Sequence, residues 1–119
     1  MAVTATNLTV SPVGWAVCAT SADAQGCETI KAAPGAGVSL CIRSLSISCV
    51  SAITVTVGEG EATSAVESPI IGPVEFTATS GSPVNVTFNP PIKLTANKAL
   101  SVDASGAGNI CVIAQGYTE

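Results

Sequence analysis

Residues 38–49 read VSLCIRSLSISC, and this stretch carries the pattern that decides the fold. Large apolar side chains occupy even positions from 38 to 42 and odd positions from 45 to 49. Successive side chains of a strand point to opposite faces, so each half predicts a β-strand with one buried face. A strand cannot move its apolar set to the other face without an extra residue. The change of parity at Arg43–Ser44 therefore predicts a β-bulge or a bend inside one long strand.

The same alternation recurs along the chain, and no window of useful length shows a helical apolar period. Alternating segments lie at 13–17, 53–57, 74–78, 84–88 and 100–102, and residues 110–117 are apolar on both faces. Gly, Pro and Asn separate these segments at intervals of roughly ten residues. About eight short strands with frequent turns are typical of a β-sandwich or a small barrel. The last strand is expected to lie centrally in a sheet or at an interface.

Three segments between the strands contain turn formers. Gly58 to Glu61 is expected to end the strand at 53–57, so that residues 59–69 form an exposed acidic loop. Pro69 and Pro73 bracket a short edge strand or extended link. Residues 105–109 are rich in glycine and are expected to form a hairpin loop before the last strand.

The N-terminal residues differ from the remainder. Residues 1–12 are polar and uncharged and have no clear core face, which predicts an extended arm that becomes ordered on a partner. Residues 13–119 are then a single domain, in keeping with a length of 119 residues. Residues 1–22 have neither a basic start nor an uninterrupted apolar block, so we expect no signal peptide and no membrane span.

The composition limits the partners that this chain can have. Only 10% of the residues are charged, 3% are aromatic, and the net charge is -4. Four basic residues cannot form the basic patch that nucleic acids require. Much of the surface must be Ser, Thr, Ala and backbone, which costs little to desolvate and favours permanent contact with other protein. An ordinary monomer is the alternative.

Catalytic and metal chemistry is not expected. The chain has no His, and its five cysteines are widely spaced, which argues against a zinc site. We predict unbridged thiols that act as small buried hydrophobes, with disulfide bonds as the alternative. Glu59 and Glu61 form the only close carboxylate pair and are expected to be solvated. We therefore predict no enzyme activity, no cofactor, no metal and no small-molecule substrate.

Trp15 and Tyr117 are the only large amphipathic rings. Such rings serve either as packing anchors inside a domain or as contacts to a partner. We predict a partner interface formed by Val10, Pro12, Trp15 and Tyr117, with Trp15 as its main anchor.

Five segments in a fixed order carry a resemblance to a known family. They are residues 43–49 after an apolar strand, ITVTV at 53–57, a short IGP element at 71–73, PIKLTANKALSV at 91–102 and GNICVIAQGY at 108–117. This order resembles the small jelly-roll head decoration (cement) proteins of tailed bacteriophages, over roughly residues 28–119.

The resemblance implies an all-β fold, an eight-stranded jelly-roll sandwich that follows the N-terminal arm. It also implies a homotrimer that is bound to the major capsid protein and stabilises the capsid. Such a protein is assembled in the host cytoplasm and lies on the capsid exterior of the virion. Related jelly rolls occur in tail tips and host-binding spikes. A phage tail, spike or carbohydrate-binding module that recognises a host surface is therefore the alternative.

Overall fold

The computed structural model describes residues 3–8, 14–21, 26–62, 65–77 and 83–119, and this part of the chain forms nine β-strands and no helix. The strands are β1 (Thr4–Leu8), β2 (Trp15–Ser21), β3 (Gly26–Lys31), β4 (Leu40–Cys49), β5 (Thr54–Ala62), β6 (Ala65–Glu75), β7 (Val84–Lys93), β8 (Leu100–Ala104) and β9 (Ile110–Thr118). The predicted all-β class is confirmed. The predicted number of eight strands is too low by one, because β1 lies within the predicted arm.

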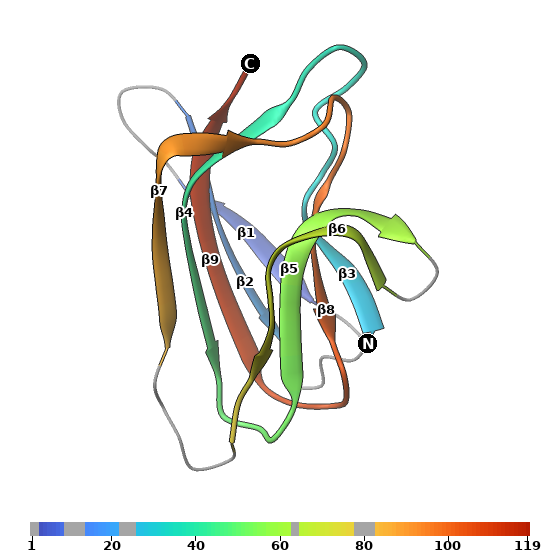
Figure 1. Ribbon diagram of the computed structural model, residues 1–119, viewed down its shortest axis with the longest axis vertical. Coiled ribbons are helices and arrows are strands. Elements are labelled where there is room, and N and C mark those ends of the chain that lie inside the picture. The colour runs from blue at the N-terminus through green and yellow to red at the C-terminus, as the bar shows by residue number, and fades with distance from the viewer. Residues whose placement is uncertain (1–2, 9–13, 22–25, 63–64, 78–82) are drawn as a thin grey trace.

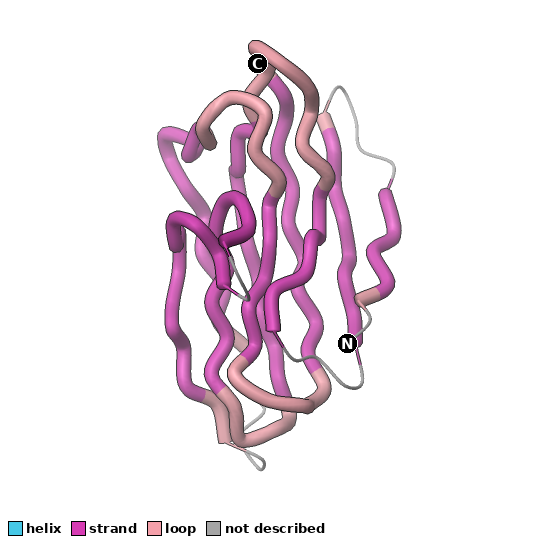
Figure 2. The backbone as a smooth tube through the Cα atoms, turned by 90° about the vertical axis from the view of Figure 1, so that its right-hand side faces the viewer, coloured by secondary structure: helices cyan, strands magenta, loops and turns pink. Residues whose placement is uncertain are grey.

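The strands form two antiparallel sheets (Figure 1). Sheet A has the order β1-β2-β9-β4-β7, and sheet B has the order β3-β8-β5-β6. Within them β5 pairs with β6, β4 with β7, β3 with β8 and β2 with β9, so each pair encloses the previous one along the chain. The strands follow the long dimension of the molecule, and loops gather at both ends (Figure 2). The central position predicted for the last strand is confirmed, since β9 lies between β2 and β4.

The core lies between the two sheets and is built from small aliphatic side chains. The fully buried hydrophobic residues include Val17, Ile30, Leu40, Ile42, Ile47, Val55, Val57, Leu100, Val102 and Val112. Branched side chains of this size fit the pleat of a strand, and burying each one contributes about 1.5–3 kcal/mol.

The bulge predicted in β4 is confirmed. The register of β4 shifts between Ile42 and Ser44 against both of its neighbours, β7 and β9. Against β9, Arg43 is the extra residue, so the apolar positions on both sides of it face the core. Against β7, the additional residues lie in β7 itself, between Thr87 and Ile92. Gly116 of β9 lies opposite Ile42, and a Cβ added there would collide with the carbonyl oxygen of Cys41. The close approach of β9 to the bulge therefore requires glycine.

The prediction of an acidic loop over residues 59–69 is wrong. Apart from residues 63–64, which lie outside the described part, this segment belongs to the paired strands β5 and β6. Gly58 lies inside β5, where an added Cβ would collide with the main chain at Ser68 and Pro69. The glycine thus permits a close approach of two strands instead of ending one. The edge position expected around Pro69 is confirmed, because β6 is the outermost strand of sheet B.

Residues 105–109 are not a hairpin loop. They carry the chain from β8 in sheet B to β9 in sheet A, and these two strands do not pair. The backbone N–H of Ser105 donates to the carbonyl oxygen of Thr54 at 2.9 Å, which fixes this connection to β5.

The N-terminal segment differs from the predicted arm. Thr4–Leu8 pairs with β2 of the same chain, with Thr6 opposite Cys18, and forms an edge of sheet A. All five residues are exposed, which agrees with the lack of a core face in the sequence. Val10 and Pro12 lie outside the described residues.

Candidate interaction surface

The surface of sheet A that points away from sheet B is the candidate site. Ile110, Val112 and Ala114 of β9 are buried against sheet B, so the residues between them point outward. The strand register places further side chains on this same side. We call the set the outer face of sheet A: Thr4, Thr6, Leu8, Ala16, Cys18, Thr20, Ser44, Ser46, Ser48, Asn85, Thr87, Cys111, Ile113 and Gln115. None of these residues is charged, but the same side of the sheet continues past the bulge to Tyr117, Cys41 and the charged Lys93.

The outer face also collects exposed apolar side chains. Among the described residues the exposed large hydrophobics are Leu8, Val50 and Ile113, at 45%, 56% and 44% exposure. Leu8 and Ile113 belong to the outer face, and Val50 follows the last residue of β4 at one end of it. The sequence pattern did not predict that Leu8, Val50 and Ile113 are interface residues. The apolar character of both faces of residues 110–117 did, however, indicate an apolar residue such as Ile113 on an outer surface.

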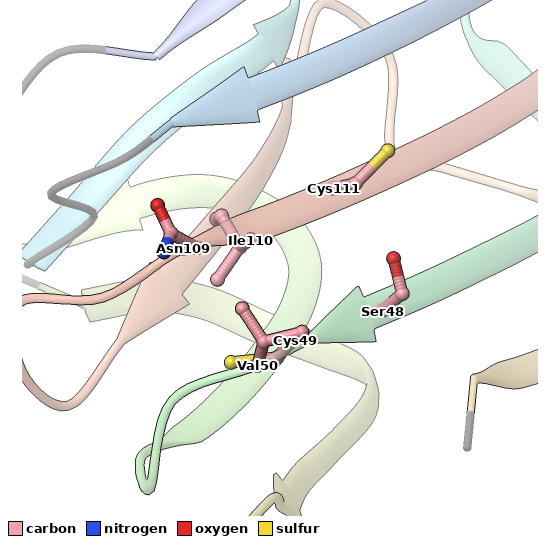
Figure 3. Close-up of a pocket in the computed structure, with 6 residues that line it drawn as sticks. All are labelled: Ser48, Cys49, Val50, Asn109, Ile110 and Cys111. Atoms are coloured by element: carbon pink, nitrogen blue, oxygen red, sulfur yellow. The ribbon is translucent and has the colours of Figure 1, made fainter. Parts of the chain in front are cut away.

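A shallow pocket lies at this end of the outer face. It has a cavity volume of about 160 Å³ and is lined by Ser48, Cys49, Val50, Asn109, Ile110 and Cys111. Figure 3 shows Ser48 on β4 and Cys111 on the neighbouring strand β9. The pocket provides small apolar and hydroxyl groups but no charged group, so it suits the side chain of another protein better than a polar metabolite.

Two thiols lie near the middle of the outer face. Cys18 of β2 and Cys111 of β9 are diagonal neighbours, because Cys18 lies opposite Ile113. Burial raises the pKa of Cys111, and the adjacent Cys18 thiol, which hydrogen-bonds to it, acts in the same direction. The Cys111 thiol therefore stays protonated at neutral pH and is a poor nucleophile.

The cysteines form no disulfide bond with one another, as the sequence predicted, and all five lie in the described part of the chain. Only Cys41 and Cys49 are buried. The prediction of buried small hydrophobes therefore holds for these two and fails for Cys18, Cys27 and Cys111, which are half-buried.

Charged groups of sheet A gather at the opposite end, near the bulge. The guanidinium of Arg43 lies 4.7 Å from the ring centroid of Tyr117. The ammonium of Lys93 lies 3.4 Å from the carboxylate of Glu119. A hydrogen bond with Cys41, followed by burial, raises the pKa of Tyr117, so its hydroxyl stays neutral. This charged end adjoins the outer face, whose own residues carry no charge.

Trp15 and Tyr117 are brought together, but Trp15 faces the core. Its side chain is 7% exposed, and its Nε1–H donates to the carbonyl oxygen of Tyr117 at 3.1 Å. The ammonium of Lys31 lies 5.6 Å from the centroid of the indole ring. Trp15 is thus a packing anchor between the sheets, and little of its ring is available to a partner. Tyr117 is half-buried beneath Arg43.

Two of the acidic side chains have structural contacts. Glu59 Oε1 accepts a hydrogen bond from the backbone N–H of Thr95 at 3.1 Å, and Glu67 pairs with Lys98 at 2.9 Å. Both contacts tie the β5–β6 hairpin to the turn before β8. In the described ranges no group of three or more His, Cys, Asp or Glu could hold a metal ion. The same ranges contain no helix that could cross a membrane.

No protein-family model, curated protein or solved structure matches this chain.

Proposed function

We propose that this chain is a non-enzymatic structural protein of a tailed bacteriophage that decorates and stabilises the capsid. It binds as a homotrimer to the major capsid protein on the exterior of the virion, and the outer face of sheet A is its contact surface. The observation that carries the proposal is that Leu8 and Ile113, two of the three exposed large hydrophobics among the described residues, lie on the outer face of sheet A, and that the third, Val50, lies at one end of it. Exposed apolar side chains that share one face, in place of a scatter over the whole surface, favour an interaction site there.

The strand order supports a jelly-roll assignment. Strands β2 to β9 divide into β2-β9-β4-β7 and β3-β8-β5-β6, and they form nested antiparallel pairs. A jelly roll is a two-sheet sandwich of eight strands, and capsid proteins are among its common uses. In this assignment β1 is an additional edge strand.

The energetics of the outer face suit permanent contact. Hydroxyl groups such as those of Ser44 and Ser46 cost far less to desolvate than ionised groups, so most of the face can be buried without a large penalty. Removing the exposed parts of Leu8, Val50 and Ile113 from water then gives a net gain of roughly 25 cal/mol per Å². Three linked copies multiply such modest contacts through effective concentration.

The experiment uses heads of the phage that encodes this chain, purified without the chain. The protein is added and its binding measured by co-sedimentation. The variant Ile113→Asp places a charge at the centre of the outer face, and we expect at least tenfold weaker binding, or about 1.4 kcal/mol. Its melting temperature is expected to stay near that of the wild type, because Ile113 is exposed.

Ala96→Asp is the matched control. Ala96 is exposed in the turn between β7 and β8, away from the outer face, so the same charge should leave binding unchanged. Equal losses from the two variants would show that the contact lies elsewhere. A wild-type protein that does not bind heads, or that microscopy locates at the tail, would overturn the decoration role.

A further inference from the structure

The four edge strands of the two sheets are not protected equally. In sheet A, β7 contains Pro90 and Pro91, which donate no main-chain hydrogen bond. In sheet B, β6 contains Pro69 and Pro73, and β3 has a register shift and ends at Lys31. Proline, bulges and lysine are the devices by which proteins prevent their sheet edges from pairing with other chains.

The fourth edge, β1, has none of these devices. It reads TATNL, without proline or charge, and its register against β2 runs without a shift from Thr4 to Leu8. All five residues are exposed. On the inner side, Ala5 and Asn7 line an open groove of about 260 Å³ beside residues 29–32. The edge of β1 therefore presents a row of main-chain N–H and C=O groups to an incoming strand.

We propose that β1 joins two copies of this chain by antiparallel β1–β1 pairing around a two-fold axis. The second copy is the partner that fits, because β1 itself is the one unprotected edge within the described part of the chain. A protein with a net charge of -4 repels its own copies, and β1 keeps charge out of the seam. Such an interface is isologous, with the same strand contributed by each copy.

The pairing has a defined register. Placing Thr6 opposite Thr6 of the second copy pairs all five residues, and Thr4 then lies opposite Leu8 of the second copy. This register keeps Thr4, Thr6 and Leu8 on the outer face in both copies, because opposite residues of an antiparallel pair share a face. Threonine pairs across strands are favourable.

The consequence for function follows from the direction of the axis. A two-fold axis perpendicular to the sheet leaves both outer faces on the same side, so the two outer faces become one continuous surface, with charged groups only at the bulge end of each sheet. On a capsid this contact would join copies that belong to different trimers. That last step rests on the proposed function, whereas the pairing itself does not.

The test is self-association of the full chain, measured by sedimentation equilibrium over a range of concentrations. Thr6→Lys and Thr6→Glu each place like charges opposite one another at the two-fold axis, and each variant alone should associate roughly fivefold more weakly. An equimolar mixture of the two variants should regain the wild-type association or exceed it, because opposite charges then meet. This recovery also excludes misfolding as the cause of the loss.

Thr87→Lys is the control, since Thr87 is exposed on the outer face at the β7 edge of the same sheet. An equal loss with this variant would overturn β1 pairing in favour of a contact through the face. A mixture that fails to recover would overturn the register. The two proposals fail separately. A wild-type chain that binds heads but does not self-associate overturns the pairing alone, and a wild-type chain that self-associates but does not bind heads overturns the decoration role alone.

Discussion

The two faces of sheet A are made by the same strands and are both poor in charge, yet the inner face is buried and the outer face is exposed to solvent. Ile47 of β4 lies on the inner face with 0% exposure, whereas Ile113 of the neighbouring strand β9 lies on the outer face with 44% exposure. Sheet B covers the first, and no described part of the chain covers the second. The comparison teaches that apolar character alone does not separate residues that stabilise the fold from residues available to a partner.

The largest effect is expected for Trp15→Ala, on the inner face. The indole is nearly buried and donates a hydrogen bond to Tyr117, so its removal should destabilise the isolated protein by about 3–5 kcal/mol. Urea denaturation measures this loss. If the free energy of unfolding is unchanged and binding to heads is weaker, the result would support the partner contact that the sequence predicted for Trp15.

A matched pair of isoleucines tests the comparison directly. Ile47→Ala leaves a cavity between the sheets and should lower the free energy of unfolding by about 2–5 kcal/mol. Ile113→Ala removes the same atoms from the outer face and should change the free energy of unfolding by no more than about 0.5 kcal/mol. Urea denaturation of both variants measures the difference, and similar losses would mean that the isolated chain already buries Ile113.

The smallest effect is expected on the outer face of sheet B, where Asp103 lies opposite Thr56. Burial raises the pKa of Asp103, so the folded state holds the proton more tightly than the unfolded state. The resulting stability is present below about pH 4 and is lost as the pH rises through the folded-state pKa. Asp103→Asn should therefore give a small gain in melting temperature at pH 7 and almost none at pH 3. A lower melting temperature of Asp103→Asn at pH 7 would contradict this expectation and show that the carboxylate has a favourable partner.

Local patterns predicted the strands and the irregularity inside β4, because strand alternation is visible in the residues themselves. The same patterns failed where the cause was a distant residue. The local sequence at Gly58 resembles the end of a strand. Glycine is required there for another reason, because an added Cβ would collide with the main chain at Ser68 and Pro69. The connection at 105–109 resembled a hairpin, since nothing local shows that β8 and β9 pair with other strands.

The candidate surface was predictable only in part. The low charge and the apolar character of both faces of the last strand indicated that this protein contacts others. The meeting of Leu8 with Ile113 on one face depends on the order β1-β2-β9, which brings residues from opposite ends of the chain together. β1 itself escaped prediction because its five residues are all exposed and show no alternation between buried and exposed positions.

The nested order of strand pairs also sets the sequence of events during synthesis. The hairpin β5–β6 can close once residue 75 has been made, but β4 must wait for residue 93, β3 for residue 104 and β2 for residue 118. At typical translation rates β2 waits on the order of ten seconds for β9. Pairing between distant strands is also slow in itself. We therefore expect the nascent chain to fold from its middle toward its ends, so that β2, although it is made early, pairs with its central neighbour β9 last.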